Sequence, residues 1–352
     1  MPPHNTSFQK RLHFPLVDSH FFSMPKPVKS KTTGKNIGYG KVILFGEHFV
    51  VHGAEAIVAG ISEYTECRLE INPGVPGLQV DDRRPAIPGY IAQKRDEQKK
   101  AHQLVLDHLK VDLSGDGLKM FIDGPLVPSS GIGASASDVV AFSRALSELY
   151  QLNLTDEEVN QSAFVGEGGY HGTPSGADNT AATYGGLISY RRQDGKSAFK
   201  PIAFQQRLYL VVVSTGITAS TMKVVNDVHK MKHQQPARFK RLYDSYTHIV
   251  SQAREALQKG DLQRLGQLMN ANHDLCREID VSCRELELIV QTCRTYGALG
   301  AKLSGTGRGG IAVALAASND QRDAIVKGLK AECPEAKFIW GYTVQPSTAS
   351  NL

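Results

Sequence analysis

The segment from Pro128 to Ser137, PSSGIGASAS, is the first of four stretches whose residue types favour anion chemistry. It lies between an apolar run at 118–122, which predicts a strand, and a segment at 135–150 with helical spacing. Glycines let the backbone approach an anion closely, and the first N–H groups of a helix have no partner within it. Strand, glycine-rich bend and helix start therefore predict a phosphate cradle, although such loops also occur as plain connectors.

The second stretch, GKVILFGEHFVVHG at 40–53, places charged residues at both ends of an apolar run. The residues at 41–45 predict a short buried strand. Lys41 opens this strand, and Glu47 and His48 follow its end. Any one of these charges is more often simply solvated at a surface. Together they put a cation at one end of a buried strand and a carboxylate with an imidazole at the other.

The third stretch, GEGGYHGTPSGADN at 166–179, contains two carboxylates separated by a turn. Thr-Pro-Ser-Gly is typical of a turn, and Asp178 follows it at the start of a small-residue stretch that we expect to be helical. The simpler interpretation is a carboxylate stabilised by the helix dipole. The alternative is an Asp held to meet a substrate hydroxyl, with Glu167 near the end of the preceding helix able to hold a metal ion.

The fourth stretch, KLSGTGRGG at 302–310, joins two segments that both read as strands. A hairpin needs at most two glycines, whereas this turn has four. The excess indicates a backbone that passes close to something, such as a ligand phosphate.

The elements that must position these residues follow an α+β order. Thr155 and Glu158 form a capping-box pattern, and Asp261 is an expected N-cap. We expect a domain boundary between residues 191 and 208, near Gln193. Strands are predicted at 41–45, 63–71, 118–122, 187–191, 208–214, 298–303, 310–315 and 337–344, and helices at 94–109, 135–150, 156–165, 319–331 and over about 80 residues after Thr218.

Composition limits the classes of function. The chain has 352 residues, 41% of them hydrophobic, which is enough for two domains with cores. A net charge of +5 without a basic stripe interleaved with aromatics predicts no nucleic-acid site. Five cysteines without zinc spacing indicate a reducing compartment, and no apolar run reaches the length of a membrane span. Residues 1–36 predict a leader, disordered at least to residue 23, with Met24 as an alternative start.

The four stretches, 40–53, 125–137, 166–179 and 302–315, resemble the GHMP kinase family in their order and spacing, and within it the branch that phosphorylates mevalonate. The resemblance covers roughly 37–344. It implies a two-domain α+β GHMP kinase fold with a ribosomal-protein-S5-like N-terminal domain at 37–195 and a ferredoxin-like C-terminal domain at 196–352. The active site would lie in the cleft between the two domains.

The resemblance also implies the role of each matching residue. Asp178 and Lys41 would be catalytic, Asp178 meeting the substrate hydroxyl as a base or as an orienting group. Ser135 and Glu167 would hold Mg²⁺. Positions expected to bind the ATP phosphates are Ser130, Gly131, Ile132, Gly133, Ala134, Ser135 and Ala136. Positions expected to bind the substrate are Lys41, Glu47, His48, Asp178, Gly305 and Thr306.

The implied activity is ATP- and Mg²⁺-dependent phosphorylation of the C5 hydroxyl of mevalonate in isoprenoid and sterol synthesis, by a cytoplasmic homodimer that binds neither nucleic acid nor membrane. Two alternatives stay open: a relative acting on phosphorylated mevalonate, for which no extra cationic cluster is visible, and a non-catalytic sensor. Ala134 stands where the family often has Ser, and Arg308 interrupts a glycine run and is expected to face solvent. The C-terminal tripeptide at 350–352 weakly resembles a peroxisomal address.

Overall fold

A computed structural model provides the structure of the chain. It describes residues 36–86, 89–128, 131–172, 174–193, 196–217 and 219–346. The predicted leader, Ser130 and the C-terminal tripeptide lie outside the described residues.

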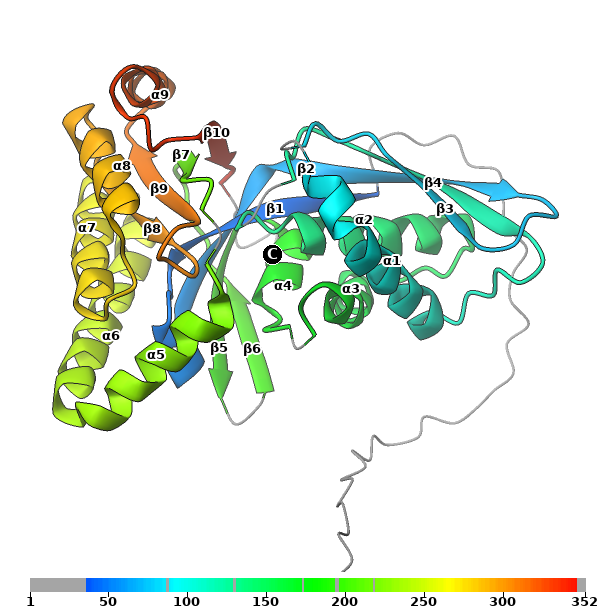
Figure 1. The fold of residues 1–352 in the computed structure, drawn as a ribbon, viewed down its shortest axis with the longest axis horizontal. Coiled ribbons are helices and arrows are strands. Elements are labelled where there is room, and N and C mark those ends of the chain that lie inside the picture. Colours follow the sequence, from blue (N-terminus) through cyan, green and yellow to red (C-terminus); the bar gives the residue numbers. More distant parts are fainter. Residues whose placement is uncertain are drawn as a thin grey trace, which may run out of the picture.

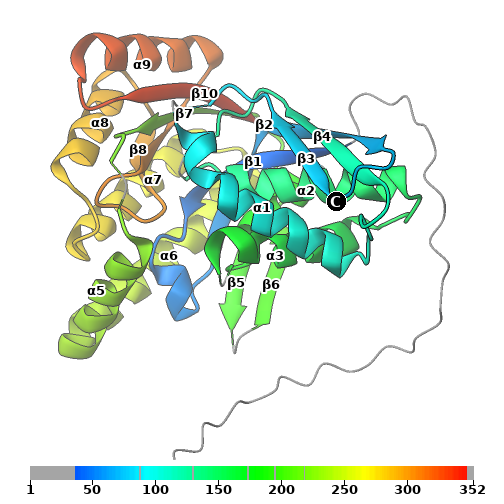
Figure 2. The ribbon, with the colours of Figure 1, turned by 45° about the vertical axis from the view of Figure 1, so that its right-hand side comes forward.

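The first half of the chain is built on a six-stranded sheet. Its strands run in the order β3-β4-β2-β5-β6, with β1 paired to β2, and only the β3–β4 pair is parallel. Helices α2 and α4 pack against one face of this sheet, and α3 packs on both of them (Figure 1). Helix α1 packs against α3, and Figure 2 shows these two helices side by side. The elements are β1 (Ile37–Phe45), the short 3₁₀ helix η1 (Phe49–His52), β2 (Ala56–Asn72), β3 (Leu78–Asp82), α1 (Tyr90–His108), β4 (Gly117–Asp123), α2 (Ala134–Leu149), α3 (Asp156–His171), α4 (Ala177–Tyr184), β5 (Leu187–Gln193) and β6 (Lys196–Pro201).

The second half forms an antiparallel four-stranded sheet in the order β10-β7-β9-β8. Helices α7, α8 and α9 pack on it, and α6 packs against α7 (Figure 1). The elements are β7 (Leu208–Ser214), α5 (Thr221–Gln234), α6 (Pro236–Lys259), α7 (Leu262–Glu278), α8 (Arg284–Thr295), β8 (Gly300–Ser304), β9 (Ile311–Ala316), α9 (Asn319–Glu332) and β10 (Phe338–Val344).

The two sheets meet along β1. The Ser304 hydroxyl on β8 donates to the Ile43 carbonyl oxygen at 2.9 Å, and the Ile43 N–H donates back to the hydroxyl at 3.2 Å. One hydrophobic cluster includes Val42 and Leu44 of β1 together with the apolar run of β7. The two halves therefore share a core, and β1 carries its side chains into the region between them.

Most local predictions are confirmed. The Thr155 side chain accepts from the Glu158 N–H in a complete capping box, and Asp261 caps α7 through the Arg264 N–H. Helix α3 continues to His171, beyond the predicted end at residue 165, and β2 begins at Ala56 rather than at residue 63. No helix among the described residues is long and apolar enough to cross a membrane.

The change from the first sheet to the second falls inside the expected boundary region at 191–208, although not at 195/196 itself. Strand β6 pairs with β5 from Gln193↔Lys196 to Ile188↔Pro201, so the first sheet extends to Pro201. The chain changes sheet between Pro201 and Leu208. The Asp-Gly pair at 194–195 is a common hairpin signal between strands, which explains why a composition change there does not mark a domain boundary.

Candidate active site

A lysine and an aspartate from distant parts of the chain meet at the centre of the candidate site. Lys41 lies on β1 with its side chain only 7% exposed, and its Nζ is 3.2 Å from Oδ2 of Asp178. Asp178 is the second residue of α4, whose N-cap is Gly176 in the left-handed conformation. A carboxylate at this position is stabilised by the helix dipole, and its side chain remains 28% exposed. The predicted juxtaposition of these two groups is therefore present.

The predicted phosphate cradle adjoins this pair. The Lys41 N–H donates to the Ile132 carbonyl oxygen at 2.8 Å, which ties β1 to the loop before α2. Gly133, the N-cap of α2, has a φ of 72° and no side chain to cap the helix. Its missing Cβ would lie 2.6 Å from Cγ of Lys41, so only glycine fits there. The first N–H groups of α2 are thus without a side-chain cap beside the Lys41 ammonium.

The other predicted loop residues contribute through the backbone. The side chains of Ile132 and Ala136 are fully buried and belong to hydrophobic clusters, and Ala134 is 5% exposed. Gly131 has a φ of 96° and lies against Ile311 at the start of β9. The loop is therefore packed between the two halves of the chain, with its N–H groups as the groups able to bind an anion.

The predicted metal ligands lie on neighbouring helices. Ser135 Oγ on α2 is 3.2 Å from His171 Nε2, and Glu167 Oε2 on α3 is 3.7 Å from the same nitrogen. Glu167 is 1% exposed, and its Oε1 is buried with no hydrogen-bond partner among the described residues. Burial and the nearby Asp178 carboxylate raise the pKa of Glu167 to about 8, although a hydrogen bond with Ser135 opposes this. A buried, unpartnered carboxylate oxygen beside a hydroxyl fits a divalent cation.

The protein provides few ligands for such a cation. No group of three or more His, Cys, Asp and Glu side chains among the described residues is arranged to hold a metal ion. Mg²⁺ commonly takes one or two protein ligands and completes its shell with water and phosphate oxygens. Ser135 and Glu167 are therefore suited to a metal that arrives with a nucleotide.

The raised pKa of Glu167 predicts a pH-dependent stability of the metal-free protein. The native state holds a proton that the unfolded chain releases near its ordinary pKa of 4.5, so stability falls as the pH rises from there through about 8. We expect Tm to fall by roughly 5 °C between pH 6 and pH 9, and the Glu167→Gln variant to lose most of this slope. Calorimetry in EDTA measures it. The exposed Glu70→Gln should keep the wild-type slope; equal slopes in all three proteins would contradict the prediction.

Glu47 and His48 occupy different surroundings. The Glu47 carboxylate accepts from the Lys302 ammonium on β8 and from Asn272 Nδ2 on α7 at 3.1 Å, and the Glu47 and Lys302 side chains have no exposed surface. The Glu47 carboxylate is therefore not accessible to a substrate in this structure, contrary to the expectation. Its contacts instead connect the first half of the chain to the second. His48 Nε2 lies 2.7 Å from the Thr306 carbonyl oxygen, and burial lowers the pKa of His48.

The glycine-rich turn after β8 is held on both sides. Thr306 Oγ1 and Thr221 Oγ1, the latter at the start of α5, are 2.8 Å apart. Arg308 has a φ of 50° and pairs with Asp227 of α5 at 2.6 Å and with Asp280 at 3.1 Å. The expectation that Arg308 faces solvent is therefore wrong. Gly305 has a φ of 88°, and apart from its chain neighbours no atom of the described residues lies within 4 Å of the position that its Cβ would occupy. The turn is therefore open to a ligand on this side.

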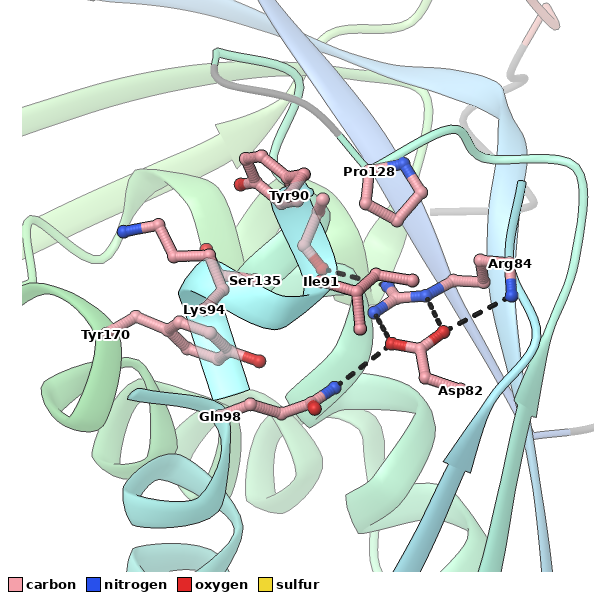
Figure 3. A pocket seen from close by; sticks show the side chains of 10 residues that line it. Asp82, Arg84, Tyr90, Ile91, Lys94, Gln98, Pro128, Ser135 and Tyr170 are labelled. Atoms are coloured by element: carbon pink, nitrogen blue, oxygen red, sulfur yellow. Dashed lines mark hydrogen bonds and ion pairs between the residues drawn. The ribbon is translucent and has the colours of Figure 1, made fainter. Parts of the chain in front are cut away.

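A small pocket opens beside Ser135. It lies between the start of α1, the end of β3 and the start of α2, and Figure 3 shows Arg84 and Asp82 paired on one side of it. Of its lining, the sequence predicted only Ala134 and Ser135 as site residues, with Pro128 in the same stretch, because the other polar residues come from segments without a recognisable motif. The lining residues are Asp82, Arg84, Tyr90, Ile91, Lys94, Gln98, Pro128, Ala134, Ser135 and Tyr170.

His171 and Lys302 also went unassigned. His171 lies within a recognised stretch, but it contacts the Ser135 and Glu167 side chains only because α3 continues to residue 171, beyond its predicted end at 165. Lys302 is a lysine in a strand that is otherwise buried and apolar. A charged residue in such a run is itself a signal, because a buried ammonium requires a partner.

Comparisons with known proteins agree with this arrangement. The profile for the GHMP kinases N terminal domain matches residues 98–186, and that for GHMP kinases C terminal matches residues 253–335. Mevalonate kinase of Thermococcus gammatolerans is 35% identical over 297 residues, covering 78% of this chain and 87% of the relative.

Two solved structures have the same fold. L. major mevalonate kinase in complex with R-mevalonate is 94% identical, with a TM-score of 0.91, over 93% of this chain and 100% of that chain. Mevalonate kinase of Methanococcus jannaschii is 23% identical, with a TM-score of 0.72, over 88% of this chain and 97% of that chain, a likeness of fold alone.

The two-domain α+β fold, with a lysine–aspartate pair beside a glycine-rich loop, defines a kinase of the GHMP class. The chain belongs to the GHMP kinase family and, within it, to the mevalonate kinases.

Proposed function

We propose that the chain transfers the γ-phosphoryl group of ATP, as its Mg²⁺ complex, to the C5 hydroxyl of mevalonate, giving 5-phosphomevalonate and ADP for isoprenoid and sterol synthesis. The observation that carries this proposal is the 3.2 Å approach of Lys41 and Asp178 beside the uncapped start of α2. The 94% identical L. major enzyme, whose structure contains R-mevalonate, supports the choice of substrate.

Each group has a defined task in this reaction. The C5 oxygen forms a bond to the γ-phosphorus while the bond from that phosphorus to the β,γ-bridging oxygen breaks, and the bond electrons leave with ADP. Asp178 orients the hydroxyl and accepts its proton on Oδ1, since Oδ2 is held by Lys41. The Lys41 ammonium stabilises the negative charge on the transferred group. The N–H groups at the start of α2 bind the phosphates.

The nucleotide site follows from the same geometry. Ser135 and Glu167 would hold Mg²⁺, which supplies positive charge to the phosphate oxygens when bound. The pocket beside Ser135 would receive the base and ribose, because it opens next to the cradle. Lys94 lines this pocket and adds a cation near the phosphates.

A coupled assay of ADP release tests the proposal directly. The purified enzyme is given ATP, Mg²⁺ and, in separate reactions, R-mevalonate, phosphomevalonate or galactose. We expect turnover with R-mevalonate and none above background with the other two. Turnover of either alternative without turnover of mevalonate would refute the proposed substrate, and mevalonate binding without ADP formation would indicate a sensor.

Replacing Lys41 with methionine tests the cation. We expect kcat to fall at least about a hundredfold, because the charge that stabilises the transferred group is lost, while KM for mevalonate changes little. Lys200→Met, at an exposed lysine on β6 of the same sheet, serves as the control and should behave as wild type. Near-normal turnover by Lys41→Met would show that the ammonium has no part in the chemical step.

A further inference from the structure

A buried carboxylate in α2 gathers donors from two other helices. Oδ2 of Asp138 accepts from Tyr170 Oη on α3 at 2.7 Å, and lies 3.0 Å from His102 Nε2 and 3.1 Å from Gln98 Nε2, both on α1. Asp138 has no exposed surface. Gln98 and Tyr170 line the pocket proposed for the nucleotide, whereas Asp138 and His102 have no part in the proposed reaction. Together the four side chains connect the three helices that surround the candidate metal ligands.

The spacing along two of these helices relates Asp138 to the metal ligands. Asp138 follows Ser135 by three positions on α2, and Tyr170 follows Glu167 by three positions on α3. Residues three apart on a helix lie on the same face, one turn from each other. Because α2 and α3 run antiparallel, as the Ser143–Ser162 contact farther along the pair shows, the Asp138–Tyr170 hydrogen bond crosses the Ser135–Glu167 pair at the same level of the helix–helix contact, within one turn of both metal ligands.

We propose that the Asp138–Tyr170 hydrogen bond is a positioning contact that sets the separation of Ser135 and Glu167 and thereby the affinity of the site for its divalent cation. This inference rests on the proposed function, which supplies the cation. A hydrogen bond one turn from the ligands acts through the rigid helices, because a shift of α3 relative to α2 moves both pairs together.

The charge state of Asp138 makes this contact strong. Burial alone would raise the pKa of its carboxyl, but His102, Arg84 and Tyr170 together outweigh burial and lower it. Burial and the Asp138 charge raise the pKa of Tyr170 well above its ordinary value, so the phenol remains a donor. A phenol donating to a buried carboxylate is a charge-assisted hydrogen bond, which is shorter and stronger than a neutral one.

The network also reaches the first residue of α2. Gln98 donates to Oδ2 of Asp82 at 3.2 Å, and Asp82 pairs with Arg84 at 2.6 Å (Figure 3). Arg84 Nη1 lies 3.5 Å from the Ala134 carbonyl oxygen and 3.1 Å from Thr65 Oγ1. Both ends of the first turn of α2, which contains Ser135, are thus fixed by buried polar contacts.

The Tyr170→Phe variant tests the inference with Ser143→Ala as its matched control. The control removes a buried contact between the same two helices, since Ser143 Oγ and Ser162 Oγ are 2.9 Å apart, but it lies two turns farther from Ser135. The affinity for Mn²⁺ in the presence of a non-hydrolysable ATP analogue is measured by electron paramagnetic resonance, and the Mg²⁺ activation constant by steady-state kinetics.

We expect the Mn²⁺ dissociation constant and the Mg²⁺ activation constant of Tyr170→Phe to rise about tenfold, with KM for mevalonate within about twofold of wild type. Ser143→Ala should bind Mn²⁺ as wild type does. Wild-type metal affinity in Tyr170→Phe, or an equal loss in Ser143→Ala, overturns the inference. Where Tyr170→Phe does not fold, Asp138→Asn, which removes the charge and keeps the volume, is judged by the same criteria.

The result also separates this inference from the proposed function. A wild-type enzyme that phosphorylates mevalonate only with a divalent cation, together with undiminished Mn²⁺ binding by Tyr170→Phe, refutes the positioning role alone. A wild-type protein that binds no Mn²⁺ beside the nucleotide analogue refutes both.

Discussion

Replacing Asp178 with asparagine is expected to lower kcat about a thousandfold, the largest catalytic effect of any single substitution in the site. Asparagine has nearly the same shape and can still orient a hydroxyl through its carbonyl oxygen, but it cannot accept a proton. It also removes the negative charge that holds the Lys41 ammonium at 3.2 Å. Isothermal titration should show mevalonate binding within a few-fold of wild type, which separates loss of chemistry from loss of binding.

Asp156→Asn is the matched control for this substitution. Asp156 is also a carboxylate in the first turn of a helix, α3, but it is 61% exposed and pairs with Arg144 at 2.6 Å. It should leave kcat unchanged, since it shares only the helix-dipole role with Asp178. A loss of less than tenfold in Asp178→Asn would mean that orientation through a neutral group suffices and that no proton transfer to this side chain is needed.

The order of the elements could be predicted because most of them carry a local signal. Strand β7 is an unbroken apolar run, and α3 begins at the capping box of Thr155. Strands β3 and β6 were missed because both lie at the edges of the first sheet and expose most of their residues. An edge strand is defined by its hydrogen bonds to one neighbour, which leave little trace in its own sequence.

The same distinction applies to the site. Lys41, Ser135, Glu167 and Asp178 could be predicted from three short stretches, and the structure brings these four groups together. The residues that hold these groups in place could not be predicted in the same way, because Asp138 contacts Tyr170 only after the helices have packed. A sequence shows that a charge stands in an apolar stretch, whereas the neutralising group depends on tertiary contacts.

Among the buried charges that depend on a tertiary partner, the Glu47–Lys302 ion pair has the largest expected effect on stability. Lys302→Met is expected to lower the free energy of unfolding by about 3–5 kcal/mol, because it leaves the Glu47 carboxylate buried with Asn272 as its remaining described partner. Denaturant unfolding followed by circular dichroism measures the change. The exposed Lys259→Met on α6, which loses only a surface pair with Glu255, should cost less than about 1 kcal/mol.

The double variant Glu47→Gln/Lys302→Met decides between two explanations of that loss. If the uncompensated charge is the cause, removing it should restore much of the stability lost in Lys302→Met, since a neutral amide tolerates burial far better than a carboxylate. If the double variant is instead no more stable than Lys302→Met, the loss comes from the packing of the lysine stem between β8 and α7.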